Sequence, residues 1–176
     1  SLQKKIKPGE FVVIDQFIDR TKNRKDTFYD GPITTHISGA NPYCPILQKT
    51  AYDTIWAQKI SGHNGGTAVV ISGPRFSSKA ESQWFSKMGW DVVNMTQYPD
   101  MVLARELEMC YCGIALITDY DIGVDGVEPV SVEDMLAIFQ QNMEKIKTVI
   151  FEMVDTIDTS TPCSCHSALQ GARFND

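Results

Sequence analysis

Apolar residues recur along the chain in short continuous runs. The runs cover residues 11–17, 67–71, 91–94 and 110–117. The last run has no polar side chain except that of Tyr111, which is typical of a strand that is covered on both faces, whereas the first run is apolar in its first half and polar at its end. The sequence therefore predicts four buried strands. Polar or small residues follow each of them, so the chain leaves the core where each run ends.

Helical spacing fills the intervals between these runs. Apolar residues four apart follow Pro45, which predicts a helix from that residue. Ser78 and Glu81 form a capping box, the signature of a second helix start. Two more helices are expected over residues 99–109 and from residue 131 onward. The alternation predicts an α/β fold, with a mainly parallel or mixed central sheet and helices on both faces.

The length of 176 residues suits one domain, which we place at residues 1–155. The polar segment 156–176 is expected to be a loosely ordered tail. Residues 19–35 form a polar loop that we expect to be mobile. Residues 62–66 contain two adjacent glycines and are expected to end the first helix, with His63 as a loop residue.

Charge and composition exclude several classes of partner. The formal net charge is -6, whereas nucleic-acid binders need a basic surface for the phosphate backbone. No apolar run approaches the roughly 20 residues that span a bilayer. The five cysteines are an odd number and two lie in apolar sequence, which favours a reduced, cytoplasmic protein. We therefore expect neither a nucleic-acid nor a membrane partner.

Three of the predicted strands end in residues that could bind a ligand. These residues are Phe76, Ser77, Met95, Thr96, Thr118, Asp119 and Asp121. Parallel strands place their carboxyl ends on one edge of the sheet, where ligands bind in α/β folds. An aromatic ring, a hydroxyl and two acids suit a nucleoside. A zinc site at these ends is not expected, because no histidine or cysteine is among them.

Each of these residues also has a plainer interpretation. A lone aromatic such as Phe76 more often packs in a core. A threonine before a helix, such as Thr96, is most often a cap, although free N–H groups there could also hold an anion. The acids after residue 117 could be a solvated turn.

Several motifs in order carry a resemblance. The segments G-P-R-F-S-S-K-A-E, V-V-N-M-T and T-D-Y-D, together with F-V-V-I-D-Q-F-I-D-R-T, F-Y-D-G and N-P-Y-C-P, resemble the methylthioadenosine phosphorylase branch of the trimeric purine nucleoside phosphorylase family. The match extends to about Phe151. It implies a homotrimer that needs no cofactor and uses inorganic phosphate as co-substrate.

The resemblance implies a role for each strand-end residue. Phe76 would lie against the base, with Ser77 near its edge. Met95 would pack on the ribose, and Thr96 would bind phosphate. Thr118 would line the site beside base and sugar.

The same resemblance assigns the chemistry to two acids. Asp119 would hold the purine N7 and the 6-amino group, with Asp121 assisting. The apolar wall around the 5′-methylthio group would come from Val132, Met135 and Leu136, and His36 would reach that pocket in a neighbouring subunit. The absence of charge in this wall suits a thioether.

The implied reaction is phosphorolysis of 5′-methylthioadenosine to adenine and 5-methylthioribose 1-phosphate, a step of purine and methionine salvage. A protonated Asp119 that donates to N7 would stabilise the departing purine. The alternatives are a phosphorylase for 6-oxopurine nucleosides or methylthioinosine, and a catalytically incomplete nucleoside-binding fragment. The last is open because the family's N-terminal segment, with its phosphate loop, is expected to lie outside this chain.

The remaining candidates are expected to be structural. Cys163, Cys165 and His166 could form a metal site with Cys110 and Cys112, but buried cysteines are common in strands, and two free thiols in a tail are favoured. Arg75 could bind phosphate, but a structural ion pair is favoured.

Overall fold

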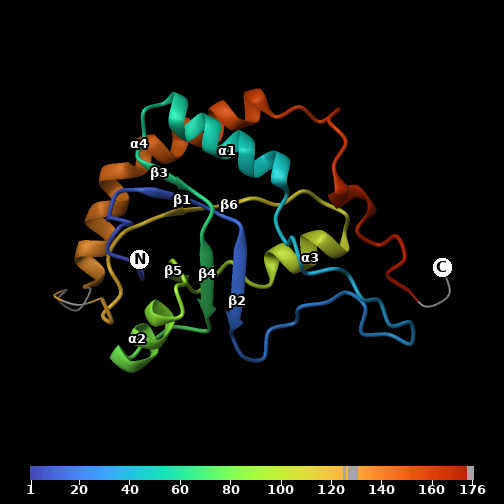
Figure 1. Ribbon diagram of the computed structural model, residues 1–176, viewed down its shortest axis with the longest axis horizontal. Helices are drawn as coiled ribbons and strands as arrows, with labels where there is room; N and C mark the ends of the chain where they lie inside the picture. The colour runs from blue at the N-terminus through green and yellow to red at the C-terminus, as the bar shows by residue number, and fades with distance from the viewer. Residues whose placement is uncertain (125, 127–130, 174–176) are drawn as a thin grey trace.

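The computed structural model describes residues 1–124, 126 and 131–173. Within these ranges the chain forms six strands, four α-helices and one 3₁₀ helix (Figure 1). In chain order they are β1 (Phe11–Ile14), β2 (Gln16–Arg20), α1 (Pro45–Ala57), β3 (Gly62–Asn64), β4 (Thr67–Ile71), α2 (Lys79–Lys87), β5 (Val92–Asn94), α3 (Asp100–Glu106), β6 (Gly113–Leu116), α4 (Val132–Thr156) and η1 (Ser164–Ser167).

The described strands form two sheets of three strands each. One sheet has the order β3-β1-β6, and the other has the order β2-β4-β5. β1 pairs with β3 in parallel and with β6 antiparallel, whereas all pairs in the second sheet are parallel. The predicted α/β class with mixed pairing is confirmed. The expectation of parallel ends on one edge is wrong for β6, because it runs against β1 in the other sheet.

The two sheets are joined by one bent ribbon. The strand expected over residues 11–17 divides at Asp15 into β1 and β2, and its partner divides at Gly65 and Gly66 into β3 and β4. The Asp15 carboxylate accepts the backbone N–H of Gly66 at 3.1 Å. Gly65 has φ +91°, and a Cβ there would lie 2.7 Å from the same carboxylate. Only glycine meets both conditions at low cost.

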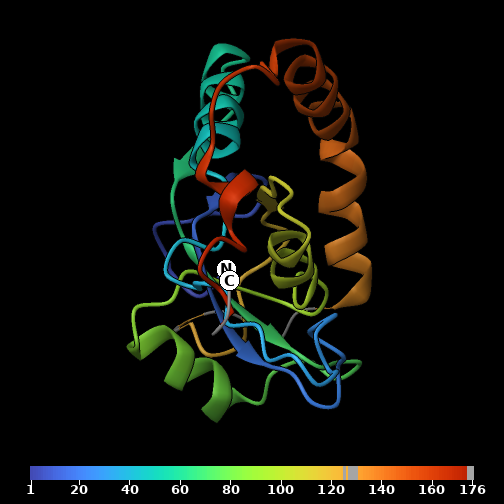
Figure 2. The ribbon, with the colours of Figure 1, turned by 90° about the vertical axis from the view of Figure 1, so that its right-hand side faces the viewer.

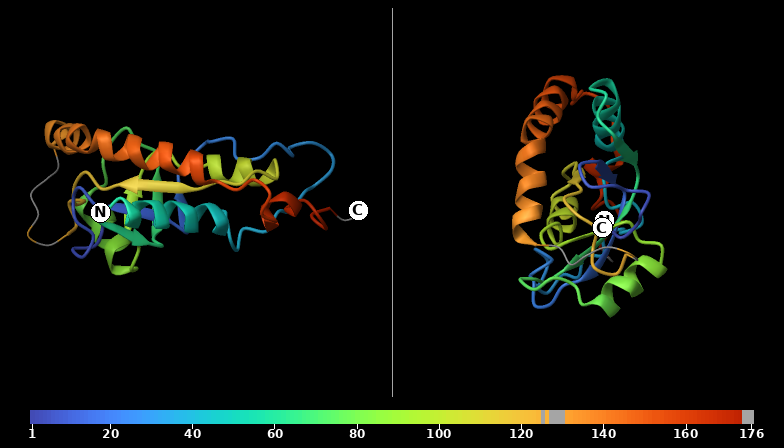
Figure 3. Two further views of the ribbon diagram at one scale, coloured as in Figure 1. Left: turned by 90° about the horizontal axis from the view of Figure 1, so that it is seen from above. Right: turned by 90° about the vertical axis from the view of Figure 1, so that its left-hand side faces the viewer.

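Alternating side chains of the ribbon face different layers. Phe11 and Val13 pack on α1 and α4, whereas Val12 and Ile14 join a core shared with β4 and α3. On the other sheet, Val69 faces Phe85 of α2. Helices therefore cover both outer sides, with α1 and α4 at one end of the molecule and α2 at the other (Figures 1 and 2). Viewed from above, α1 and α4 run along the same face (Figure 3).

Local signals set the ends of the helices. α1 begins at Pro45, where the missing N–H of proline costs nothing in the first turn. At α2, the Ser78 hydroxyl accepts the N–H of Glu81 and the Glu81 carboxylate accepts the N–H of Ser78, so the capping box is confirmed. Arg75 pairs with Glu81 through two hydrogen bonds of 2.7 and 2.8 Å, which confirms the expected ion pair. α3 is shorter than expected, ending at Glu106.

Two expectations about irregular segments are wrong. Residues 62–64 form β3, because they pair in parallel with β1 directly after α1 ends. His63 therefore lies in a strand, and its Nε2 is 2.8 Å from Glu10 Oε2. The described part of the tail is fixed to the fold. Cys165 and Ala172 are buried, and the carbonyl of Ala172 accepts the N–H of His36 at 2.8 Å.

α4 carries the longest apolar pattern of the chain. Val149 and Met153 are buried against α1 and the first sheet, whereas Phe151 and Val154 are two-thirds exposed. Within the described ranges, no helix combines the length and the apolar character needed to cross a lipid bilayer.

The capping box of α2 yields a stability test. Ser78→Ala removes the acceptor for the Glu81 N–H, and we expect the free energy of unfolding to fall by about 1 kcal/mol. Urea denaturation followed by circular dichroism measures the difference. Lys79→Ala, one residue further on the exposed helix surface, is the matched control and should change stability far less. Equal losses in both variants would contradict the cap's role.

Candidate functional site

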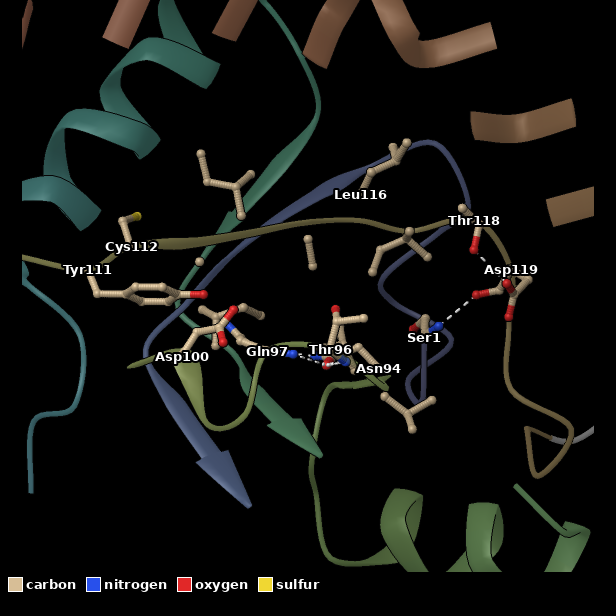
Figure 4. Close-up of a pocket in the computed structure, with 17 residues that line it drawn as sticks. Ser1, Asn94, Thr96, Gln97, Asp100, Tyr111, Cys112, Leu116, Thr118 and Asp119 are labelled. Carbon is tan, nitrogen blue, oxygen red and sulfur yellow. Dashed lines mark hydrogen bonds between the residues drawn. The ribbon is translucent and has the colours of Figure 1, made fainter. Parts of the chain in front are cut away.

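A cavity of about 420 Å³ lies between β5 and β6 (Figure 4). β6 contributes its whole length and the residues that follow it, and β5 contributes its three residues and the turn after it. The polar side chains of the lining include Asn94, Thr96, Gln97, Tyr111, Thr118 and Asp119. The cavity therefore brings together polar residues from two strand ends, although these strands belong to different sheets.

The end of β6 positions the two candidate acids. The N–H of Ile117 donates to the carbonyl of Glu10, which holds the chain beside β1 until Thr118. The Thr118 hydroxyl donates to Asp119 Oδ2 at 2.6 Å (Figure 4). Asp121 is 5% exposed, and its Oδ2 has no hydrogen-bond partner in the described part of the chain. Asp119 is thus a hydrogen-bonded carboxylate at the cavity, whereas Asp121 is a buried carboxylate two residues further on that does not line it.

The turn after β5 is shaped by Asn94. Its Oδ1 accepts the backbone N–H groups of Thr96 and Gln97 at 3.2 and 3.1 Å, and its amide donates to the Gln97 side chain. An asparagine that bonds its own following backbone fixes a tight turn. This turn presents the exposed side chain of Thr96 at the cavity. Asn94 and Gln97 were not predicted as site residues.

The ends of β4 and β5 meet at Gly73. This residue has φ +68°, and a Cβ at its position would lie 2.6 Å from the Met95 sulfur. Glycine therefore allows the Met95 side chain to pack directly on the turn that follows β4. Met95 lies beside the cavity-lining Thr96, so the β4 end is linked to the site through this contact.

The loop after β6, which is the third predicted strand end, packs against α2. The N–H of Gly123 donates to Ser82 Oγ at 2.7 Å, and a Cβ at Gly123 would lie 2.4 Å from the backbone of Gln83. The loop after Asp121 is thus pressed against α2, whose start directly follows Phe76 and Ser77. Ser77 is buried with no partner for its hydroxyl among the described residues, and Phe76 is 43% exposed.

Eight predicted residues do not line this cavity. Phe76, Ser77, Met95 and Asp121 belong to the strand ends described above, and the other four lie elsewhere. Val132, Met135 and Leu136 stand on the first turns of α4, with Val132 and Leu136 about half exposed. His36 lies in the loop before α1, where its backbone bonds to the tail. The roles of these four residues stay predictions.

Arg24 is a positioning residue that sequence reasoning missed. Its guanidinium donates to the carbonyl oxygens of Ser72 at 3.3 Å and Met95 at 2.6 Å, and also to that of Tyr98. It therefore ties the end of β4 to the end of β5. The loop over residues 19–35, which the sequence predicts to be mobile, is held to the fold by these bonds. A single arginine in a polar loop gives no sequence signal for such a role.

A buried carboxylate anchors the same loop. Glu106 is 4% exposed and accepts the Thr27 hydroxyl and the Phe28 N–H, both at 2.7 Å. Buried charges persist where hydrogen bonds replace water. The loop is thus fixed on α3 as well as on the strand ends.

The pattern of conserved sequence that defines the Phosphorylase superfamily matches residues 1–155. The chain belongs to this superfamily. Among its relatives, proteins named S-methyl-5′-thioadenosine phosphorylase from Mycolicibacterium smegmatis and Thermofilum pendens are 45% and 41% identical over 97% and 98% of the chain. A purine nucleoside phosphorylase from Streptomyces coelicolor is 41% identical over 93%. The chain spans 65%, 64% and 62% of the length of the Thermofilum, Mycolicibacterium and Streptomyces relatives, respectively.

Solved structures of the superfamily share the fold. The methylthioadenosine phosphorylase of Schistosoma mansoni in complex with adenine superposes with a TM-score of 0.90 at 30% sequence identity. The match covers 98% of this chain and 69% of that one. The nucleoside phosphorylase-like α/β/α architecture expected from the sequence is thereby confirmed.

Removing the Arg24 contacts should weaken the link between the strand ends. Arg24→Met keeps the length of the side chain but loses the three carbonyl bonds, and we expect the free energy of unfolding to fall by about 2 kcal/mol. Chemical denaturation measures this loss. Lys25→Met, at the exposed neighbouring position, is the control; if it destabilised the protein as much, the assigned role of Arg24 would be wrong.

Proposed function

We propose that the protein to which this chain belongs cleaves 5′-methylthioadenosine with inorganic phosphate. The products are adenine and 5-methylthioribose 1-phosphate. The observation that carries the proposal is the 45% identity, over 97% of the chain, to the Mycolicibacterium smegmatis protein named S-methyl-5′-thioadenosine phosphorylase. The presence of Thr96, Thr118 and Asp119 around one cavity supports it.

The proposed reaction forms one bond and breaks another at C1′ of the sugar. A phosphate oxygen bonds to C1′ while the bond from C1′ to purine N9 breaks, and the bonding electrons leave with the purine. A proton at N7 neutralises the purine, and Asp119 is the proposed donor. Thr118, whose hydroxyl bonds to Asp119 Oδ2, would hold the free carboxyl oxygen toward the base. Asp121 lies two residues further on and would support this orientation.

Asp119 also bears on the choice of base. A carboxylate oxygen accepts from a 6-amino group and repels the oxygen of a 6-oxopurine, so it favours adenine. The second candidate function is phosphorolysis of 6-oxopurine nucleosides or methylthioinosine. It is supported by the 41% identity to the purine nucleoside phosphorylase of Streptomyces coelicolor.

The remaining assignments follow from the same proposal. Phosphate would bind at Thr96, and the base and sugar would contact Phe76, Ser77 and Met95. The exposed apolar residues of α4, which include Phe151 and Val154, would suit contacts in a homotrimer. A cytoplasmic place in purine and methionine salvage fits the five free thiols.

Calorimetric titration of the chain with 5′-methylthioadenosine, with and without phosphate, tests the binding half of the proposal. We expect binding in both conditions, strengthened by phosphate, because adjacent subsites reinforce each other. Binding that phosphate leaves unchanged would support a nucleoside site without the phosphate subsite. Failure to bind the nucleoside in either condition would overturn the proposal for this chain.

The role of Asp119 is tested by Asp119→Asn in the longest protein that the gene encodes. Asparagine cannot supply the proton, so we expect kcat/KM for 5′-methylthioadenosine to fall roughly 10²–10⁴-fold. The ratio of activity on inosine to activity on 5′-methylthioadenosine should rise, because the amide can donate to a 6-oxo group. Release of the free base, followed by chromatography, measures both.

Asp53→Asn is the matched control, because Asp53 is an exposed aspartate on α1 that pairs with Lys49. It should leave both activities unchanged. If the wild-type protein preferred inosine to 5′-methylthioadenosine, the second candidate function would replace the first.

A further inference from the structure

Four of the five cysteines converge from three distant parts of the chain. Cys44 precedes α1, Cys110 precedes β6, and Cys163 and Cys165 lie in the tail. Their Sγ atoms all lie within 4.8 Å of one another, and those of Cys44 and Cys163 are 3.4 Å apart. All five cysteines are free thiols. The four sulfur atoms therefore lie close enough together to share one ion.

We propose that Cys44, Cys110, Cys163 and Cys165 bind one Zn²⁺ ion in a tetrathiolate site. Zinc binds thiolate sulfur at about 2.3 Å in a tetrahedron, which places the sulfur atoms roughly 3.8 Å apart. The observed spacing brackets this value. Four thiolates close the coordination sphere, so the site is structural and leaves no position for a water or substrate. Binding releases the thiol protons to solvent.

Neighbouring groups hold the sulfur atoms in place. The N–H of Cys165 points at Cys163 Sγ at 3.4 Å, and His166 Nε2 lies 3.6 Å from Cys110 Sγ. Donors of this kind orient metal-bound thiolates and offset their charge. The N–H of Cys44 donates to the carbonyl of Tyr111 at 2.8 Å, which fixes Cys44 beside the strand that Cys110 precedes.

The burial of the four cysteines suits a structural ion that joins distant segments of the chain. Cys44 and Cys165 are 1% and 2% exposed, whereas Cys110 and Cys163 are partly open to solvent, which gives the ion a route to the site. The tail that carries two of the ligands also bonds to the loop of Thr35 and His36 and to Glu108. The ion would therefore fasten the tail across α1 and the start of β6.

The sequence allows a metal site of the tail cysteines with Cys110 and Cys112, but favours free thiols instead. The structure keeps Cys110 but replaces Cys112 with Cys44. Cys112 is not among the clustered thiols, and its side chain packs instead with the core around Phe11 and Ile55. Cys112 is therefore not a ligand of the proposed zinc ion, and it can serve as the control cysteine.

Metal analysis of the full chain, purified under reducing conditions and passed through gel filtration, tests the site. We expect one zinc ion per chain. After chelation, titration with Co²⁺ alone should give the visible absorption bands of a tetrahedral thiolate site. In the folded protein, the reactivity of the partly exposed Cys110 and Cys163 toward a thiol reagent should rise when the ion is removed. Absence of bound metal, with no Co²⁺ spectrum, would overturn the proposal.

Substitutions separate the ligands from a general effect of losing a thiol. Cys163→Ser and Cys110→Ser should each retain less than half of the zinc of the wild-type chain, whereas Cys112→Ser should retain it fully. Circular dichroism checks that each variant is folded, and the Co²⁺ spectrum of the wild-type chain decides the matter if a variant is not. A mass decrease that shows disulfides among these four cysteines in the reduced preparation would also overturn the proposal.

Discussion

The bend in the parallel ribbon at Asp15 is the constraint on which the rest of the structure depends. On one side of the bend the ribbon pairs with β6, and on the other side it pairs with β5. At the bend the Asp15 N–H still donates to the Gly66 carbonyl at 3.2 Å, and the Asp15 carboxylate adds a bond from the Gly66 N–H, with Gly65 leaving room for it. Without this bend the strands before and after it would continue in one sheet, and β5 and β6 would not face a common cavity.

The site depends on connections between elements more than on any one element. Arg24 holds the ends of β4 and β5, and Gly73 lets Met95 lie against the turn between strand and helix. Gly123 brings the loop after β6 onto α2. Each contact joins residues that are distant in sequence. The candidate site is therefore a property of the assembled fold, and its strand ends come from two sheets.

Local signals explain what the sequence could predict. A proline in the first turn marks the start of α1, a capping box marks α2, and Ser131 caps α4 by accepting the N–H of Asp134. Candidate residues at strand ends were found because polarity changes abruptly there. Asp119 and Thr118 are the clearest example, since they follow an uninterrupted apolar run.

Pairing and long-range contacts could not be predicted in the same way. The polar pair Asp15 and Gln16 interrupts the apolar run over residues 11–17, but two polar residues do not by themselves reveal that the strand divides there. The antiparallel direction of β6 is set by its partner β1, which lies about a hundred residues earlier in the chain. The meeting of Cys44 with the tail cysteines has the same origin, because no local pattern links a helix start to a distant tail.

The buried polar atoms of Ser77 and Asp121 have a thermodynamic consequence. A buried hydroxyl or carboxylate oxygen without a partner costs roughly 1–3 kcal/mol. Within the described residues, the side-chain oxygens that are buried without a partner are Tyr43 OH, Ser77 Oγ and Asp121 Oδ2, and Asp121 lies two residues from Asp119 of the candidate site. A ligand that supplied donors or acceptors to these atoms would bind the folded state alone. The apparent melting temperature of the protein would then rise with the logarithm of ligand concentration, which makes thermal stability a report on occupancy.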